Sequence, residues 1–220
     1  MAVYERLCIS YKRVYLFEGI PGSGKTSFIK ALASNFGYDI ASLHFNSKME
    51  DNEFLRLMNN LPKKAFLLFE DMDCLFKSRK EHDTDSNRVT LSGILNGLDG
   101  ISTKHGLICF ITTNYKGHLD QALIRPGRVD KIVTFDYVVQ EQVGDIYKAF
   151  MWECYDEVKF KEFFKALTDL RIKVNVSILT QYLFEYYNNP EEALKNIKNM
   201  KDSFNDSKIE TTTDDTDMYT

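Results

Sequence analysis

The stretch that decides the fold is Gly19-Ile-Pro-Gly-Ser-Gly-Lys-Thr26, which matches the pattern G-x-x-x-x-G-K-[ST] at every fixed position. A strand-like run, residues 14–18, precedes the motif, and a stretch with helical periodicity, residues 25–36, follows it. In such a loop the glycines let successive backbone N–H groups face one phosphate chain, and the helix N-terminus adds partial positive charge. The motif therefore predicts a phosphate-binding loop, or P-loop.

The side chains of the motif have separate expected tasks. Lys25 is expected to reach the outer phosphates, and the hydroxyl of Thr26 is expected to ligate Mg²⁺. ATP and Mg²⁺ are therefore the expected cofactors. The predicted nucleotide-binding residues are Gly19, Pro21, Gly22, Ser23, Gly24, Lys25, Thr26 and Ser27.

Outward from the P-loop, short strand-like runs alternate with helical patterns as far as residue 137. Strands are expected at residues 14–18, 39–45, 65–69, 107–113 and 131–137. Helices are expected at residues 25–36, 51–60 and 86–98. This order predicts an α/β fold of the P-loop NTPase type, with a parallel five-stranded sheet flanked by helices.

From Gln140 onward only helical periodicity remains, with apolar residues at spacings of three and four, and Asn189-Pro190 has the cap and first-turn residues of one more helix. We therefore expect three parts. Residues 1–138 form the nucleotide-binding core, residues 139–203 a small helical lid, and residues 204–220 a disordered tail rich in Thr and Asp.

Carboxylates follow directly after the apolar run at residues 65–69. Glu70 and Asp71 are the first two, and they fall at the carboxyl end of a strand, where parallel α/β sheets hold their ligands. One carboxylate is expected in the Mg²⁺ shell, beside Thr26, and the other is expected to polarise the water that attacks the γ-phosphate. The residues alone do not decide whether Glu70 or Asp71 is the Mg²⁺ ligand and which of them is the base.

Two later segments add candidate catalytic groups. Asn114 directly follows the strand-like run at 107–113 and is a candidate to orient the attacking water. Arg125 and Arg128 lie three residues apart on a Pro-Gly turn, as expected of arginines that supply charge to a transition state, often on a neighbouring subunit. The alternative for both arginines is an internal salt bridge to Asp120 or Asp130.

Composition excludes several other classes of protein. The 220 residues carry 28 basic and 32 acidic side chains, a net charge of −4, so a nucleic-acid partner is not expected. Even the longest uninterrupted apolar runs, such as residues 65–69, are far shorter than a membrane span. The four cysteines form no C-x-x-C pair, which favours a soluble protein of a reducing intracellular compartment.

The order of these motifs resembles that of the AAA family of ATPases. Along this chain the motifs are, in order, the P-loop, the acidic strand end, Leu95-Asn-Gly-Leu-Asp-Gly100, Thr112-Thr-Asn114 and Arg125-Pro-Gly-Arg128. Within the family, residues 8–200 most resemble the ATPase module of the mitochondrial branch that translocates the Rieske iron–sulfur protein. The stretches Glu70-Asp-Met-Asp73 and Val89–Gly100 are among those that carry this closer likeness. Neither a membrane location nor the Rieske protein as substrate is predicted for this chain from the resemblance.

The resemblance implies ATP phosphates on Gly22–Thr26, Mg²⁺ on Thr26 with Glu70 nearby, and Asn114 as the residue that senses the γ-phosphate. It also implies that Arg125 and Arg128 act on the next subunit of a ring. The order Glu70-Asp71 is the reverse of the Asp-Glu order in most AAA proteins, although the Rieske-translocase branch resembles it. By position, Asp71 is assigned as the base.

The resulting prediction is a homo-oligomeric ATPase that hydrolyses ATP with Mg²⁺ and powers protein remodelling or translocation, with an unknown protein substrate or adaptor. One alternative is an ATP-binding switch or scaffold with little turnover. Another is a nucleic-acid ATPase similar to a clamp loader, which the acidic charge balance disfavours.

Overall fold

The computed structural model describes residues 6, 12–43, 49–73, 89–99 and 106–201. The chain forms two compact units. One comprises Met1–Ile20 and Lys25–Phe135, and the other comprises Pro21–Gly24 and Asp136–Thr220. The predicted tail, residues 204–220, lies outside the described residues.

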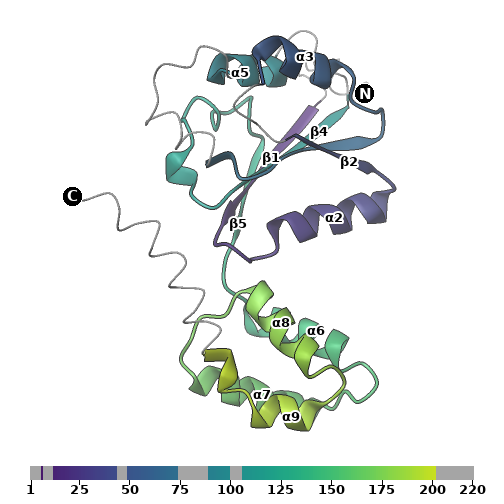
Figure 1. Ribbon diagram of the computed structural model, residues 1–220, viewed down its shortest axis with the longest axis vertical. Helices are drawn as coiled ribbons and strands as arrows, with labels where there is room; N and C mark the ends of the chain where they lie inside the picture. The colour runs from purple at the N-terminus through teal and green to yellow at the C-terminus, as the bar shows by residue number, and fades with distance from the viewer. Residues whose placement is uncertain (1–5, 7–11, 44–48, 74–88, 100–105, 202–220) are drawn as a thin grey trace, which may run out of the picture. The chain divides into compact units, whose positions relative to one another are not determined.

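The first unit is built on a five-stranded sheet with the order β2-β3-β4-β1-β5 (Figure 1). All four strand pairs are parallel, which confirms the predicted fold class. The strands are β1 (Lys12–Gly19), β2 (Asp39–Leu43), β3 (Ala65–Phe69), β4 (Leu107–Thr113) and β5 (Lys131–Phe135).

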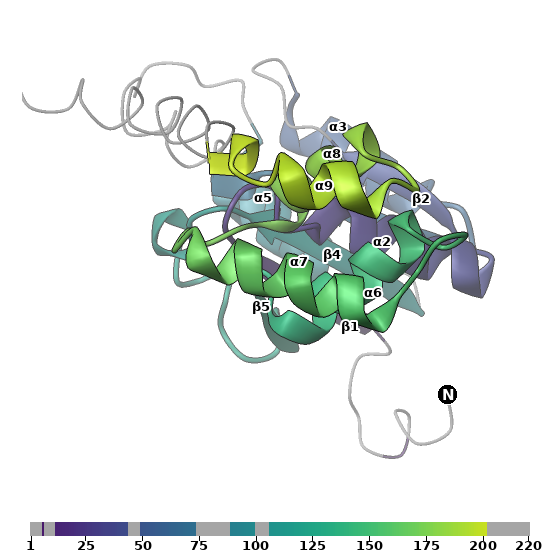
Figure 2. The same ribbon diagram turned by 90° about the horizontal axis from the view of Figure 1, so that it is seen from below.

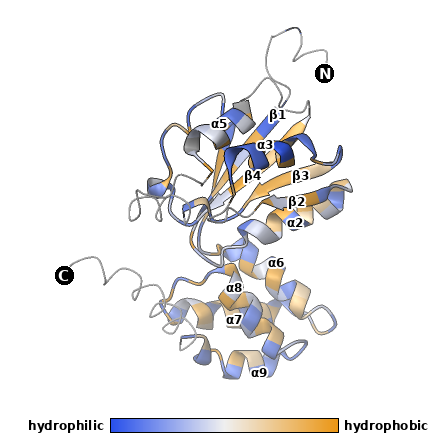
Figure 3. Cartoon of the chain, turned by 45° about the horizontal axis from the view of Figure 1, so that its top comes forward, coloured by the Kyte–Doolittle hydropathy of each residue, from blue (hydrophilic) through white to orange (hydrophobic). Residues whose placement is uncertain are grey.

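Helices cover both faces of this sheet (Figure 1). Helix α2 (Lys25–Phe36) lies on one face, and α3 (Asp51–Asn59) and α5 (Leu91–Asp99) lie on the other. The α2 face has a core of Ile29, Ala33, Phe17, Phe66, Leu68 and Phe110. The opposite face has a larger core that includes Phe54, Ile94, Leu16, Leu67, Phe69 and Ile111. Burial on both faces explains why β3 is apolar at all five positions, and the hydropathy colours of Figure 3 show this in β3 and β4.

Helix α5 begins at Leu91, later than the predicted start at residue 86, because Thr90 caps it. The Thr90 hydroxyl accepts a hydrogen bond from the backbone N–H of Gly93 at 2.8 Å. Asp51 of α3 fixes Thr90 in turn, accepting from its backbone N–H at 2.7 Å and from its hydroxyl at 2.8 Å. Strand β5 also ends two residues earlier than predicted. Residues 44–45 and 86–88, which belonged to a predicted strand and a predicted helix, lie outside the described residues.

The second unit consists of packed helices (Figure 2), as predicted from the periodicity after Gln140. They are α6 (Gln140–Phe150), α7 (Glu157–Asp169), α8 (Val176–Glu185) and α9 (Pro190–Lys195). Their shared core includes Val143, Tyr147, Phe163, Leu167, Leu179, Leu183 and Ala193. In the part of the chain that the structure describes, no helix combines the length and the apolar character needed to cross a membrane.

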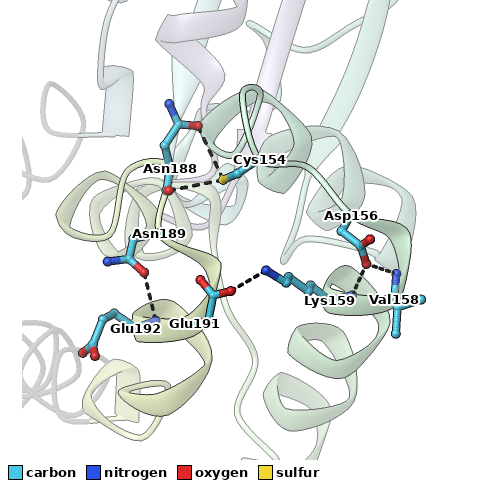
Figure 4. A network of polar contacts seen from close by, with 8 residues as sticks. All are labelled: Cys154, Asp156, Val158, Lys159, Asn188, Asn189, Glu191 and Glu192. Atoms are coloured by element: carbon cyan, nitrogen blue, oxygen red, sulfur yellow. Dashed lines mark hydrogen bonds and ion pairs between the residues drawn. The ribbon is translucent and has the colours of Figure 1, made fainter.

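Polar side chains in this unit cap the helices and join them at the surface. Asp156 accepts hydrogen bonds from two backbone N–H groups at the start of α7, and Asn189 accepts one at the start of α9 (Figure 4). An ion pair between Lys159 and Glu191 links α7 to α9. The Cys154 thiol donates to the carbonyl of Asn188 at 3.2 Å. These residues serve the local fold of the helices.

Candidate nucleotide-binding site

The P-loop leaves β1 through a glycine whose conformation other residues rarely adopt. Gly19 has a φ of +138°, and a Cβ atom there would lie 1.8 Å from the carbonyl oxygen of Phe135 on β5. Close approach of the two strands therefore requires glycine at this position. In the rest of the loop, Pro21 and Gly22 are exposed, Ser23 is buried, and Ser27 is exposed on α2.

Lys25, the first residue of α2, is held by three oxygen atoms. Its ammonium group donates to the carbonyls of Gly19 at 2.8 Å and Ile20 at 3.0 Å, and to Oδ1 of Asn114 at 2.8 Å. Burial lowers the pKa of this ammonium group, and the nearby carboxylates of Asp71 and Asp73 act in the opposite direction. The fold thus brings together two predicted site residues that are 89 positions apart.

The predicted Mg²⁺ ligands are also in contact. Thr26 donates from its hydroxyl to Oε1 of Glu70 at 3.0 Å, and the hydroxyl of Ser42 donates to Oε2 of Glu70 at 3.5 Å. Neighbouring oxygen ligands of an octahedral Mg²⁺, each 2.0–2.1 Å from the metal, are about 2.9 Å apart. The oxygens of Thr26 and Glu70 therefore fit two adjacent positions around this ion.

Among the described residues, no group of three or more His, Cys, Asp or Glu side chains is arranged to bind a metal. Mg²⁺ in nucleotide sites is commonly held by one or two protein groups together with phosphates and waters. The pair formed by Thr26 and Glu70 agrees with that kind of site.

Asp71 is an exposed residue with an unusual backbone conformation. Its φ is +48°, in the left-handed region that non-glycine residues seldom occupy, and its backbone N–H donates to the hydroxyl of Thr112 at 3.1 Å. Such conformations are costly and occur preferentially at functional sites, where surrounding contacts maintain them. Here the contact comes from Thr112, near the end of β4, and fixes the direction in which the chain leaves β3.

Asp73, which was not among the predicted site residues, links the ends of β3 and β4. It is 3% exposed, and its Oδ1 accepts from the hydroxyl of Thr113 at 3.0 Å and from the backbone N–H of Asn114 at 3.2 Å. Asp73 therefore positions the residue whose side chain contacts Lys25. The signal in the sequence was a third carboxylate after β3 together with paired threonines at the end of β4.

Arg125 and Arg128 lie on a separate turn of the same unit. The backbone carbonyl of Arg125 accepts from the backbone N–H of Arg128 at 3.1 Å, and Nη1 of Arg128 donates to the carbonyl of Ala122 at 2.6 Å. Arg125 is exposed, and Arg128 is partly buried. Asp130, one of the alternative partners of these arginines, forms an ion pair with Arg13 at 3.3 Å.

The tip of the P-loop, Pro21–Gly24, belongs to the second unit and contacts the start of α8. Nδ2 of Asn175 donates to the carbonyl of Pro21 at 3.1 Å, and the backbone N–H of Ser177 donates to the carbonyl of Gly22 at 2.9 Å. Neither contact was predicted from the sequence. The available signal was an asparagine in the cap position immediately before a helix.

A cavity of about 390 Å³ lies in the helical unit, lined by residues of the segment 136–140, of α6 and α7, and of the segment 172–174. None of the predicted site residues lines it. The candidate site is therefore defined by its side chains and the P-loop, and this cavity is a separate feature.

A P-loop at the end of β1, with acidic and amide side chains at the ends of β3 and β4, defines a nucleotide-binding protein of the P-loop class. The family model for the ATPase family associated with various cellular activities (AAA) matches residues 15–137. The chain belongs to this family of ATPases.

Curated relatives extend the similarity into the helical unit. The probable mitochondrial chaperone BCS1-A of Dictyostelium discoideum is 35% identical over 206 residues, which cover 90% of this chain and 48% of that protein. The human mitochondrial chaperone BCS1 is 32% identical over 200 residues, 88% of this chain and 48% of that protein. The probable mitochondrial chaperone bcs1 of Schizosaccharomyces pombe is 43% identical over 151 residues, 67% of this chain and 33% of that protein. The chain thus spans about half the length of the first two relatives and a third of the last.

Proposed function

We propose that this chain binds ATP with Mg²⁺, hydrolyses it as one subunit of a ring, and uses the energy to remodel or translocate a protein. The observation that carries the proposal is the contact between Lys25 of the P-loop and Asn114 of the neighbouring strand end, at 2.8 Å. This contact joins the residue expected to bind phosphate with the residue expected to orient water.

Lys25 would bind the outer phosphates of ATP by exchanging one of its three oxygen partners for a phosphate oxygen. An ammonium group has three donors, and Gly19, Ile20 and Asn114 account for all three in the present arrangement. Exchange of Asn114 would leave its amide available for water. Binding of ATP would in this way reorganise the group nearest the attacking nucleophile.

Thr26 and Glu70 would hold Mg²⁺, which neutralises charge that develops on the phosphates during transfer. Asp71 is the proposed base that accepts a proton from the attacking water. Its exposed position after β3 and the anchoring of its backbone by Thr112 support this assignment. Because aspartate is one methylene shorter than glutamate, the water must lie correspondingly closer to β3.

Arg125 and Arg128 are the proposed groups that complete the site of the next subunit. Arg125 is exposed, and backbone hydrogen bonds close the turn between Asp120 and Val129, so the backbone that carries Arg125 is fixed. A rigid turn presents guanidinium groups to a partner at low entropic cost. The names of the relatives describe chaperones, which supports protein remodelling as the work performed.

Release of phosphate from Mg-ATP, measured across a series of protein concentrations, tests the proposal. Turnover per subunit should rise with concentration as rings assemble, because each site needs arginines from a neighbour. The variant Lys25→Ala should lose turnover. Lys30→Ala removes the same charge from an exposed position of the same helix and should retain it.

Two outcomes would contradict the proposal. Equal turnover of the Lys25→Ala and Lys30→Ala variants would mean that the P-loop does not perform hydrolysis. ATP binding without turnover at any concentration would instead favour the alternative of an ATP-binding switch or scaffold.

A further inference from the structure

The carboxamide of Asn175 contacts two parts of the second unit at once. Its Oδ1 accepts from the backbone N–H of Ile178 at 2.9 Å and so caps α8. Its Nδ2 donates to the carbonyl of Pro21 in the P-loop at 3.1 Å. One side chain therefore ties the start of a helix to a loop 154 residues earlier in the chain.

A second hydrogen bond holds the next peptide of the loop. The backbone N–H of Ser177 lies in the first turn of α8, where it has no partner within the helix, and it donates to the carbonyl of Gly22 at 2.9 Å. Two consecutive carbonyls of the P-loop, those of Pro21 and Gly22, are thus bound by the start of α8.

These bonds determine where the neighbouring N–H groups point. Among the described residues there is no cis peptide bond, and in a trans peptide the N–H of one residue is antiparallel to the carbonyl of the residue before it. The N–H groups of Gly22 and Ser23 are therefore directed away from α8. Backbone N–H groups of this loop are the donors expected to bind phosphate.

Packing at Gly22 makes the arrangement specific. The φ of Gly22 is +70°, and a Cβ atom there would lie 2.9 Å from Nδ2 of Asn175 and 2.9 Å from Cβ of Ser177. Glycine is thus required both by the backbone conformation and by the close approach of α8.

We propose that Asn175 is a positioning residue for ATP binding, because its carboxamide orients the P-loop peptides whose N–H groups bind the phosphates. The proposal rests on ATP binding at the P-loop. It does not depend on hydrolysis or on ring formation. Asn175 acts through the loop and not by touching the nucleotide.

The test compares two substitutions that keep the helix cap and remove the donor to Pro21. Serine and aspartate both accept from backbone N–H groups at helix starts, but neither carries a donor in the place of Nδ2. Asn175→Ser is uncharged, so it separates loss of the donor from repulsion of ATP by an added negative charge.

The matched control is Asn189→Ser, which alters an asparagine with the same capping role at the start of α9 (Figure 4). The full chain would be titrated with a fluorescent ATP analogue in Mg²⁺ to obtain Kd, followed by steady-state kinetics and thermal unfolding without nucleotide.

We expect Asn175→Ser and Asn175→Asp each to raise the Kd for the analogue by about fivefold to tenfold, the size of one lost hydrogen bond. The KM for ATP should rise, whereas kcat should stay within about twofold of the wild-type value, because the loop binds the ground state and the transition state alike. Asn189→Ser should leave Kd unchanged, and thermal unfolding should show that both serine variants stay folded at the temperature of the titration.

Three results would overturn the proposal. The first is an unchanged Kd in Asn175→Ser. The second is a raised Kd in Asn175→Asp alone, which would assign the effect to charge. The third is a lower unfolding temperature for Asn175→Ser together with an equal rise of Kd in Asn189→Ser. That result would assign the weaker binding to lost stability of the helical unit. Failure of the wild-type chain to bind the analogue would instead refute ATP binding, on which the proposal rests.

Discussion

The two units of the chain use their polar side chains differently. In the α/β unit, side chains from distant positions meet one another at the carboxyl ends of strands, as Lys25 meets Asn114 and Thr26 meets Glu70. In the helical unit, polar side chains mostly cap the helix on which they lie, as Asp156 does. The first arrangement concentrates charge and donors in one place, as phosphoryl transfer requires, whereas the second stabilises the fold locally.

Asn175 departs from this division. It caps α8 like the other capping residues, yet it also reaches the P-loop tip, which belongs to the helical unit. We therefore expect substitutions in the α/β site to affect chemistry, substitutions of ordinary caps to affect stability, and changes around Asn175 and Gly22 to affect ATP binding.

The largest effect is expected from Asp71→Asn, which removes the proposed base and keeps the size of the side chain. Loss of a general base lowers kcat by roughly 10²-fold to 10⁴-fold, while ATP binding should persist. Asp39→Asn changes an exposed aspartate at the start of β2 and serves as the control. A kcat for Asp71→Asn equal to that of Asp39→Asn would remove Asp71 from the mechanism.

Gly22→Ala tests whether the contact with α8 matters beyond backbone conformation. Gly37 also has a positive φ, of +64°, but a Cβ atom there would meet nothing within 4 Å. Gly37→Ala should therefore cost only the conformational penalty, about 1 kcal/mol of unfolding free energy. Gly22→Ala should cost more and should also weaken ATP binding, as measured by urea unfolding and by titration. Equal losses in the two variants, with ATP binding intact, would argue against the role of this contact.

A smaller effect, confined to stability, is expected from Asp156→Ala. Asp156 accepts from Val158 and Lys159 at the start of α7, and loss of such a cap costs about 1 kcal/mol. Chemical denaturation should show this loss, and kcat and KM should stay at wild-type values. A large drop in kcat would mean that the caps of the helical unit take part in chemistry after all.

The smallest effect concerns pH. Because burial lowers the pKa of Lys25 below its ordinary value of 10.5, the unfolded chain binds more protons at this residue in the window just below 10.5. The contribution of Lys25 to the free energy of unfolding should therefore rise with pH in that window. The difference in unfolding free energy between wild type and Lys25→Met, measured from about pH 8 to about pH 10, should increase. A decreasing difference would indicate a raised pKa.

Much of the fold was predictable because its signals are local. The P-loop motif and the solid apolar run at Ala65–Phe69 predicted β1, α2 and β3, and all five strands were found. The strand order was not predicted, because pairing joins segments far apart in sequence whose apolar runs look alike. Nor was the exact start of α5, which depends on Thr90 being fixed by Asp51 of another helix.

The candidate site was predictable to a similar extent. The motifs identified Lys25, Thr26, Glu70 and Asn114 one by one, and the structure adds that they contact each other in pairs. The role of Asp73 beneath Asn114 and the bond from Asn175 to Pro21 depend on tertiary contacts that no spacing rule contains. The roles of Lys25, Thr26, Glu70 and Asn114, like those of Asp71, Arg125 and Arg128, stay predictions.

The most direct measurement of the central claim, a shared ATPase site in a ring, is the phosphate-release rate of a mixture of two variants. Lys25→Ala has a defective P-loop and intact arginines, and Arg128→Ala has the reverse. In a mixture of equal parts, about one quarter of the sites would combine an intact P-loop with an intact neighbouring arginine, so about a quarter of wild-type turnover should return. A mixture no more active than the average of the two separate variants would contradict a site shared between subunits.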